Sequence, residues 1–288
     1  MYPYYFNNDD IRVHHSRDVS PVPQEMHAHW MHELFYFISG KGSYYIEGTN
    51  YPLKPGCLLL MRVGETHRII TLPEYPYERI SIHFSPSVLN IADPHGTLDE
   101  CVSKRPLGQK NQYLNDILDE NLIQSCLYSI TNPGSYTANP QYRRVHTISG
   151  IYMVLCELQR CYNLPKPTPP QSSDDIISQT ITYINENLTR QFNLDYLGKM
   201  FFVDKSYLNS KFKQVTGSTI WEYTIVKRLL LAREHIRNGI SAMEAAEKCG
   251  WNDYSSFFRR YKTRFGISPS DDRKRFTSKH SDNDVRRG

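Results

Sequence analysis

The chain has no apolar run of about 18 residues, and this absence argues against a transmembrane helix and a membrane partner. It also lacks a basic segment followed by an apolar stretch at its N-terminus, MYPYYFNNDD, so we expect no secretory signal. The cysteines show no CxxC spacing and stand at positions 57, 101, 126, 156, 161 and 249. Together these absences predict a cytoplasmic protein with reduced thiols.

Charge is spread unevenly along the 288 residues. Residues 1–173 hold 14 Lys and Arg against 16 Asp and Glu, a balance of −2, whereas residues 174–288 hold 20 against 14, a balance of +6. A basic C-terminal part favours nucleic acid over an acidic protein as the partner. A solvated basic surface would carry the same charge, so the choice depends on the motifs found there.

Short runs rich in aromatic and branched residues, separated by glycine and proline, begin after His27. They read LFYFISG, GSYYIEG, YPLKPGCLLLM and ERISIHF, at positions 34–40, 42–48, 51–61 and 78–84. Such runs predict an antiparallel β-barrel or sandwich. The mixed, polar residues 1–22 predict a single strand with loose ends.

Two segments with helical spacing lie between Gln112 and Cys161. Packing on the barrel is the simplest role for these helices, and pairing with a second copy of the chain is the alternative. The next segment, LPKPTPPQSS at 164–173, contains four prolines. It predicts an extended, semi-rigid tether and a domain boundary, because proline cannot continue a helix.

The region 194–217 predicts two short helices joined by a tight turn. Asp204 is a residue type that caps a helix N-terminus, and Gly217 suits the left-handed position after a helix. Two helices joined in this way form a helix-turn-helix, whose second helix enters the DNA major groove.

A similar pair is predicted at 241–251 and 253–266, after a longer helix over 218–239 whose N-cap we place at Ser218. A last short helix is expected at 268–276. Two such readers on one rigid helix would address successive major grooves, about one helical turn (~34 Å) apart.

Four polar residues in the β-rich region have informative spacing. His27, His29 and Glu33 form the pattern HxHxxxE, and His67 ends the pattern GxxxxxRxGxxH. These patterns resemble the two motifs of the cupin family, small β-barrels with a central pocket, over roughly residues 25–85. The sequence departs from them at Arg62, where the family usually has proline, and at Thr71, where it often has asparagine.

By this resemblance, His27, His29, Glu33 and His67 would ligate a divalent metal, and imidazole with carboxylate suits iron, zinc, manganese or nickel. Two alternatives stay open. The same side chains can line a pocket for a small organic effector without metal, or they can brace the barrel.

The stretch from Leu194 to Phe276 is similar to the DNA-binding domain of the AraC/XylS family of transcription regulators. The matching residues are Leu197, Leu208, Phe212, Lys213, Thr216, Gly217, Tyr223, Arg228, Ala232, Glu244, Ala246, Gly250, Trp251, Phe257, Arg259, Tyr261, Lys262, Phe265, Gly266, Ser268 and Pro269. The sequence departs at Trp251, usually phenylalanine, at Gly198, usually alanine, and at Ala242 and Ala245, where larger apolar residues are common.

The resemblance implies an α+β protein with a cupin-like β-barrel and trailing helices, then an all-α domain with two helix-turn-helix motifs. We expect an effector-binding and dimerisation domain at 1–163, the tether at 164–173, the DNA-binding domain at 174–276 and a disordered tail at 277–288.

The expected DNA contacts follow from helix faces and from the resemblance. On the first reading helix, Leu208 and Phe212 face inward, and the outward contacts are Ser206, Asn209, Ser210 and Lys213. Asn209 can pair with adenine, and Lys213 is better placed for phosphate.

On the second reading helix, Phe257 and Tyr261 face inward, and the outward contacts are Tyr254, Ser255, Ser256, Phe258 and Arg259. The Arg259 fork matches guanine, with a phosphate contact as the alternative. Phe258 suits a thymine methyl group, and Tyr254 suits either a base or a phosphate.

These features predict a sequence-specific regulator of transcription that senses a small molecule, such as a sugar or related metabolite. We expect it to be a homodimer on double-stranded DNA, to contact RNA polymerase if it is an activator, and to be neither an enzyme nor cofactor-dependent. One alternative is a metal-dependent cupin enzyme carrying a DNA-binding module. Another is a regulator that responds to a protein partner.

Overall fold

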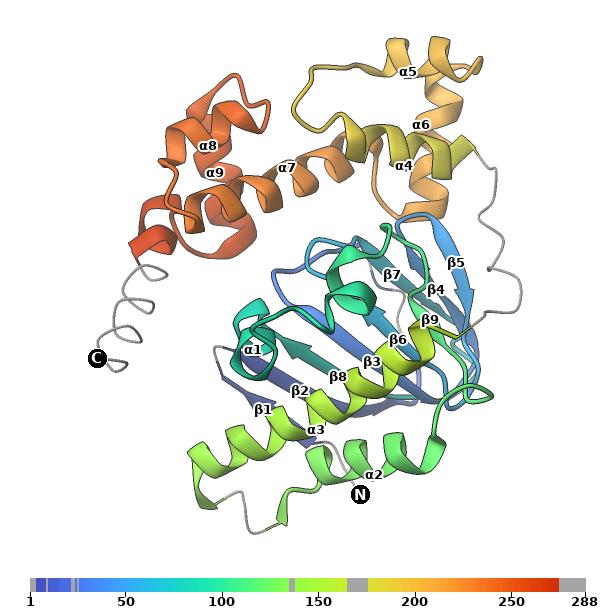
Figure 1. Cartoon of the computed structure of the whole chain (residues 1–288). Helices are drawn as coiled ribbons and strands as arrows, with labels where there is room; N and C mark the ends of the chain where they lie inside the picture. The colour runs from blue at the N-terminus through green and yellow to red at the C-terminus, as the bar shows by residue number, and fades with distance from the viewer. Residues whose placement is uncertain are drawn as a thin grey trace. The chain divides into compact units, whose positions relative to one another are not determined.

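The computed structural model describes residues 4–8, 10–21, 24, 26–134, 138–164 and 176–274. The chain divides into two compact units, Met1–Asp174 and Asp175–Gly288 (Figure 1). The predicted tether falls outside the described residues from position 165 onward, and the predicted tail at 277–288 falls outside them entirely. None of the described helices is both long and apolar enough to cross a membrane.

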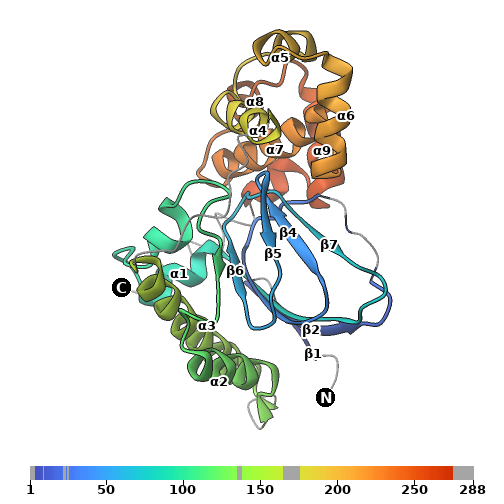
Figure 2. The ribbon, with the colours of Figure 1, turned by 90° about the vertical axis from the view of Figure 1, so that its right-hand side faces the viewer.

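The first unit is built on two antiparallel sheets (Figures 1 and 2). One has the strand order β1-β2-β8-β3-β6-β9, with strands Tyr4–Asn7, Ile11–Asp18, Tyr77–Phe84, His32–Ser39, Leu58–Met61 and Gln112–Tyr113. The other has the order β5-β4-β7, with strands Thr49–Pro52, Gly42–Ile46 and His67–Thr71. Two strands, β1 and β2, occupy the N-terminal region where a single strand was predicted.

Alternation along β3 divides the side chains of the large sheet between two cores. Phe35 and Phe37 face one way and pack with Tyr44 and Ile46 of the small sheet. Leu34 faces the other way and packs with residues of the helices. Because β3 is covered on both faces, its sequence reads as a nearly continuous apolar run.

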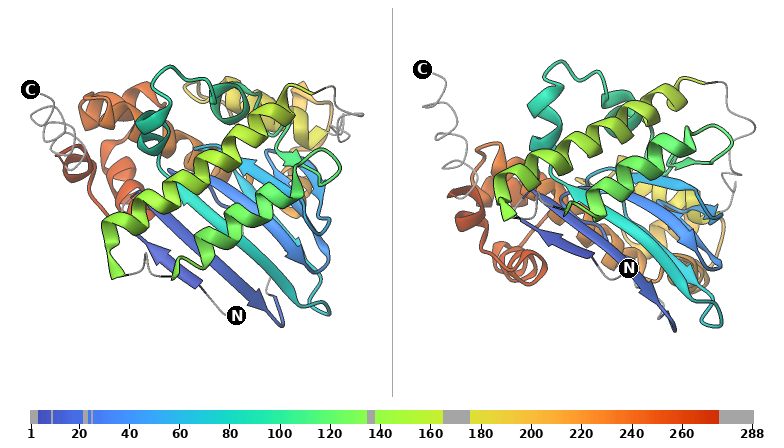
Figure 3. Two further views of the ribbon diagram at one scale, coloured as in Figure 1. Left: turned by 60° about the horizontal axis from the view of Figure 1, so that its bottom comes forward. Right: turned by 90° about the horizontal axis from the view of Figure 1, so that it is seen from below.

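Among the described residues, three helices and a π-helical turn complete this unit: α1 Pro86–Ala92, η1 Glu100–Lys104, α2 Glu120–Thr131 and α3 Pro140–Tyr162. In Figure 3, α2 and α3 run side by side across one face of the large sheet. A Cβ added to Gly150 of α3 would lie 2.8 Å from Ile130 of α2, so glycine permits this close approach. The prediction that the helical pattern starts at Gln112 was wrong, because Gln112 and Tyr113 pair with β6 and Asp119 caps α2.

The second unit is helical in the residues described, which confirms the predicted fold class. Its helices are α4 Ile176–Glu186, α5 Leu194–Met200, α6 Lys205–Thr216, α7 Ile220–Arg237, α8 Ala242–Lys248 and α9 Tyr254–Phe265, and residues 269–274 are also helical. The predicted cap of α7 at Ser218 was one residue early. Thr219 caps this helix in a reciprocal capping box with Glu222.

The second helices of the two helix-turn-helix pairs, α6 and α9, begin and end with the same residue types. Asp204 accepts hydrogen bonds from two backbone N–H groups at the start of α6, and Asp253 does the same for α9. Gly217 and Gly266 follow these helices with φ of 84° and 67°, a conformation that costs glycine little. The second helix of each pair therefore has the same length and the same caps.

Asp272, 3% exposed, ties the C-terminal helical residues to the rest of the unit. Its carboxylate accepts hydrogen bonds from Arg233 and Arg237 of α7 and from the hydroxyl of Tyr261 in α9. Burial alone would raise the pKa of this carboxyl, but Arg233 and Arg237 hold it below the ordinary value for aspartate. The charge therefore persists at neutral pH and joins three segments.

We expect Asp272→Ala to lower the free energy of unfolding of the second unit by ~3–5 kcal/mol, because it leaves two partly buried guanidinium groups without their anion. The matched control is Asp271→Ala, which removes an exposed neighbour and should cost less than ~1 kcal/mol. Urea denaturation followed by Trp221 and Trp251 fluorescence in a Trp30→Phe background would measure both. Equal losses for the two variants would contradict this role for Asp272.

Candidate effector site and DNA interface

Three histidines converge on one buried carboxylate in the first unit. Glu33 on β3 is 4% exposed and stands beside His83 on β8 in the strand register. Its Oε2 atom lies 3.0 Å from Nε2 of His29, 3.3 Å from Nε2 of His67 and 3.6 Å from Nε2 of His83. The site is therefore a carboxylate surrounded by imidazole rings.

The fourth predicted residue, His27, takes a different position. Its backbone pairs with that of His67 through hydrogen bonds of 3.0 and 2.8 Å. Its ring stands edge-on to the ring of His67, with centroids 4.4 Å apart. The structure thus brings His29 and His67 to the Glu33 carboxylate and packs the ring of His27 against the ring of His67.

The sequence interpretation missed His83. It belongs to the run 78–84, which was predicted as a strand without a functional role for any of its residues. The motif spacing does not include it, and its place beside Glu33 depends on the pairing of β3 with β8. Glu33 and His83 are separated by 49 residues, and a strand pairing over that distance leaves no short-range signal in the sequence.

The pKa values of Glu33, His67 and His83 are shifted in different directions by burial and by the neighbouring charges. Burial alone would raise the pKa of Glu33, but His83, His29 and His67 hold it well below the ordinary value. Burial lowers the pKa of His83 to about 4, so this imidazole is neutral at pH 7. Burial also opposes protonation of His67, but the adjacent Glu33 carboxylate raises its pKa overall. An ionised carboxylate is therefore kept inside the protein by its histidine neighbours.

A buried ion pair fixes the segment that carries His67. Arg105 and Glu65 are 1% and 0% exposed, and the guanidinium donates to both carboxylate oxygens at 2.7 and 2.6 Å. Glu65 also accepts from the backbone N–H of Gly108 and the side-chain amide of Asn111. The carbonyl of Glu65 in turn accepts from Nδ1 of His67 at 2.8 Å. The orientation of the His67 ring therefore depends on this buried pair.

The cluster also fits a metal ion by its donor types. One ligand atom each from His29, Glu33 and His83 lie within 4.8 Å of one another. Imidazole and carboxylate donors suit zinc and other divalent transition metals. Of the four residues proposed as ligands from the cupin resemblance, this trio contains two, and His83 is the addition.

On α6, the structure places the predicted contacts on two faces. Leu208 and Phe212 are fully buried, and of the predicted contacts Ser206, Ser210 and Lys213 are exposed. Asn209 is half-buried, and its Oδ1 accepts a hydrogen bond from the backbone N–H of Ile220 at 3.1 Å. This side chain therefore connects α6 to the start of α7.

On α9, Phe257 and Tyr261 are fully buried, while Ser255 and Arg259 are exposed. The other three predicted contacts, which were expected to face outward, are half-buried: Tyr254, Ser256 and Phe258. The ring of Tyr254 packs against Phe257, with centroids 5.8 Å apart, and it borders the apolar core of α7, α8 and α9. Of the five contacts predicted on α9, only Ser255 and Arg259 are therefore exposed.

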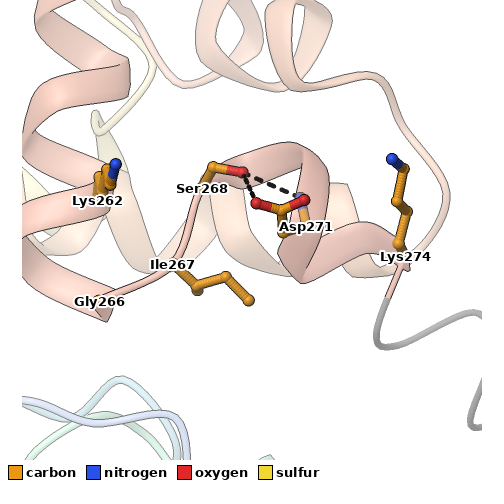
Figure 4. Close-up of a pocket in the computed structure, with 6 residues that line it drawn as sticks. All are labelled: Lys262, Gly266, Ile267, Ser268, Asp271 and Lys274. Atoms are coloured by element: carbon orange, nitrogen blue, oxygen red, sulfur yellow. Dashed lines mark hydrogen bonds between the residues drawn. The ribbon is translucent and has the colours of Figure 1, made fainter.

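One exposed cation on α9, Lys262, was quoted only as a family match and not as a contact. Its carbonyl accepts from the N–H of Gly266, as that of Lys213 does from Gly217, so the two lysines occupy matching places on their helices. Lys262 borders a surface pocket of 380 Å³ that is lined by Lys262, Gly266, Ile267, Ser268, Asp271 and Lys274 (Figure 4). The repeat of cap, apolar pair and glycine could have revealed Lys262 from sequence.

Two family models match the chain. An AraC-like ligand binding domain matches residues 12–120, and a helix-turn-helix domain matches residues 197–275. The regulatory protein SoxS of Salmonella typhimurium is 32% identical over 105 residues, covering 36% of this chain and 98% of SoxS. The transcriptional activator RhaS of Klebsiella pneumoniae is 22% identical over 248 residues, covering 85% of this chain and 86% of RhaS.

Solved structures with similarity include ToxT of Vibrio cholerae, at 13% identity and a TM-score of 0.38, covering 94% of this chain and 99% of that chain. A ligand-binding β-rich unit followed by two helix-turn-helix motifs defines a ligand-responsive, DNA-binding regulator of transcription. The chain belongs to the AraC/XylS family of transcription regulators.

We expect Arg105→Met to lower the free energy of unfolding of the first unit by ~3–5 kcal/mol, because it leaves the Glu65 carboxylate buried without its cation. The control is Arg144→Met, which removes a half-exposed pair with Asp10 and should cost no more than ~1 kcal/mol. Urea denaturation followed by Trp30 fluorescence, with both other tryptophans replaced by phenylalanine, would report on this unit.

The pH dependence supplies a second measurement of the same pair. Burial alone would raise the pKa of Glu65, but Arg105 lowers it to about 2 from an ordinary value of 4.5. The stability contributed by Glu65 is therefore complete above pH 4.5 and is lost as the pH falls toward 2. The difference between wild type and Arg105→Met should shrink over that range, and a difference independent of pH would contradict the assignment.

Proposed function

We propose that this regulator reads double-stranded DNA with α6 and α9, under the control of a small ligand bound in its first unit. One observation carries the proposal. The two helices share length, caps and a buried apolar pair, and each presents an exposed row that starts with serine, at Ser206 and Ser255, and extends to lysine, at Lys213 and Lys262. Between the serine and the lysine, α6 presents Ser210 where α9 presents Arg259. Two helices with the same scaffold and a different exposed residue suit the reading of two different base sequences.

The exposed side chains fall into two chemical roles. Ser206, Ser210 and Ser255 carry short hydroxyl groups that can donate to or accept from any base. Arg259 has the planar fork that matches O6 and N7 of guanine. Lys213, and Lys262 at the matching place on α9, are point charges suited to phosphate, which positions the protein without reading sequence.

The half-buried contacts have narrower roles in this proposal. Asn209 already uses Oδ1 for the backbone of α7, so a bidentate contact with adenine would compete with that hydrogen bond. Tyr254 and Phe258 have rings 6.3 Å apart on α9. The hydroxyl of Tyr254 suits a phosphate, and the edge of Phe258 suits a thymine methyl group. Ser256 lies within 3.5 Å of a guanidinium nitrogen of Arg259 and supports that side chain.

For the first unit, we propose that the effector binds at His27, His29, Glu33 and His67. The support is the convergence of three imidazoles on one buried carboxylate inside a unit that matches a ligand-binding domain. A ligand controls DNA binding only if it binds one arrangement of the protein more tightly than another. A sugar or related metabolite was the class expected from the sequence.

A regulatory role without catalysis is supported by the named relatives. SoxS is a regulatory protein, and RhaS and AarP of Providencia stuartii are transcriptional activators; AarP is 31% identical over 106 residues, 36% of this chain and 77% of AarP. We infer that this chain acts in the cytoplasm and contacts RNA polymerase if it activates.

The outer face of α3 supports a homodimer. Tyr142, Val145 and Met153 are 65%, 60% and 50% exposed, and Cys156 is also exposed. Their spacing places them along one side of the helix, opposite the side that packs on the sheet. An apolar stripe on a rigid helix suits pairing with the same stripe of a second copy.

We expect a Val145→Glu, Met153→Glu double variant to remain monomeric at concentrations where the wild type is dimeric, because charges in the stripe oppose its burial. Analytical ultracentrifugation would measure the change. Val19→Glu is the matched control, since Val19 is 74% exposed and lies directly after β2 in the same unit, away from α3 in the chain. A double variant that dimerises like wild type would exclude α3 as the interface.

For DNA reading, we expect Arg259→Ala to weaken binding to the preferred site by ~1–3 kcal/mol and to relax base preference at one position. The reason is the loss of a bidentate contact with guanine. Selection of bound sequences from a random pool, followed by affinity measurements, would show both effects.

Lys213→Ala is the contrast. Loss of a phosphate contact should weaken binding to all sequences alike and flatten the dependence of log K on log salt concentration by ~1. If Arg259→Ala behaved like Lys213→Ala, with preference intact, Arg259 would be a phosphate contact. If it changed neither affinity nor preference, α9 would not read DNA through this residue.

A further inference from the structure

The hydrogen bonds of two histidines fix where their protons lie. Nδ1 of His29 lies 2.7 Å from the carbonyl oxygen of Met31, and Nδ1 of His67 lies 2.8 Å from the carbonyl oxygen of Glu65. A carbonyl can only accept, so each Nδ1 must carry the hydrogen. In the neutral imidazole, Nε2 of each ring then carries a lone pair.

Both lone pairs face the same anion. The Nε2 atoms of His29 and His67 lie 3.0 and 3.3 Å from Oε2 of Glu33, and Nε2 of His67 has no hydrogen-bond partner among the described residues. Lone pairs and a carboxylate oxygen repel one another unless positive charge lies among them. A second proton on each ring would supply it, and so would one bound cation. A carbonyl that holds Nδ1–H is also the usual outer partner of a metal-ligating histidine.

His83 makes the arrangement more specific for a cation. Its Nε2 lies 3.6 Å from the same Oε2, and ligand atoms of His29, Glu33 and His83 all lie within 4.8 Å of one another. Donors bound to a metal at ~2.0–2.2 Å lie ~3–3.6 Å from their neighbours in tetrahedral or octahedral geometry. The three distances from Oε2 to the imidazole nitrogens, 3.0, 3.3 and 3.6 Å, match that spacing.

The side chains beyond the cluster favour a small occupant. Phe35, Phe37, Tyr44, Leu59 and Ile69 are each no more than 4% exposed and pack against one another between the two sheets. An organic effector the size of a sugar would have to displace part of this apolar core. A single ion needs only the donor atoms that are already in place.

We propose that His29, Glu33 and His83 bind a divalent transition-metal cation, with His67 as a further donor, and that this ion is the effector of the first unit. His83 thus replaces His27 in the ligand set suggested by the motif spacing, and His27 supports the ring of His67 instead. The binding site stands on the geometry alone, whereas the effector role rests on the proposed regulatory function.

The test uses the full chain without a polyhistidine tag. Metal content is measured after purification, and the chelator-stripped protein is titrated with Zn²⁺ and with Co²⁺, whose absorption reports the donor set. We expect one ion per chain. His83→Ala should weaken Zn²⁺ binding by more than ~100-fold, beyond the 10–100-fold usual for an outer partner, and His27→Ala should stay within that outer range.

His15→Ala is the matched control, because His15 also pairs with a glutamate, Glu78 at 2.9 Å, outside the cluster. It should bind Zn²⁺ like wild type. Circular dichroism of each stripped variant checks folding, and Glu33→Gln, which keeps the side-chain shape, supplies a second loss of binding if His83→Ala does not fold. Folded wild type that binds no stoichiometric Zn²⁺ or Co²⁺, or folded His83→Ala with wild-type affinity, would overturn the site.

DNA binding is measured separately, with and without Zn²⁺. Sequence-specific binding by a protein that takes up no metal would overturn this inference and leave the proposed function standing. Metal uptake without any sequence-specific DNA binding would do the reverse. Uptake of one ion, with specific DNA binding that is identical in both conditions, would overturn the role of the ion as effector.

Discussion

The ligand-binding unit depends on the buried pair of Arg105 and Glu65. Both charges are removed from water, so they are stable only because each is closely matched by partners, including backbone carbonyls that accept from the guanidinium. The ion pair and its hydrogen bonds hold the loop around Arg105 against the turn that precedes β7. They thereby present His67 to Glu33 with its proton on a defined nitrogen. Arg105, which lies far along the chain from the two motifs, thus helps to set the chemistry of the cluster through Glu65.

The DNA-binding unit achieves rigidity by other means. Aspartate caps, glycine ends and a buried apolar pair are repeated in α6 and α9, so neither reading helix needs a charged core residue for its own formation. Charge is used instead to connect helices, at Asp272 and at Arg228, whose guanidinium donates to the carbonyl groups of Leu188, Arg190 and Gly250. The exposed faces are then available for DNA, because the structural bonds lie behind them.

Much of this organisation could be predicted from sequence because it depends on local rules. The caps at Asp204 and Gly217 and the inward pairs of both reading helices follow from residue types within a few positions. What sequence could not supply depends on contacts between distant segments. His83 became part of the Glu33 cluster through the pairing of β3 with β8. The strand β9 was mistaken for helix because its two residues pair with β6, from which β7, β8, α1 and η1 separate it in the chain. The half-buried state of Tyr254 and Phe258 likewise follows from packing around α9 rather than from helical spacing alone.

Asn209 places a limit on how this protein can acquire new DNA targets. Its side-chain oxygen holds the first N–H of α7, the helix that separates the two readers. With the DNA contact proposed for Asn209, a substitution there would change both the fit to DNA and the packing of α7 against α6. Its effects on specificity and on stability could then not be selected independently. The side chains of Ser206 and Ser210 are exposed, and among the described residues neither is hydrogen-bonded to α7. Under the proposed reading roles, changes of target preference would therefore arise more easily at Ser206 and Ser210 of α6 and at the exposed residues of α9.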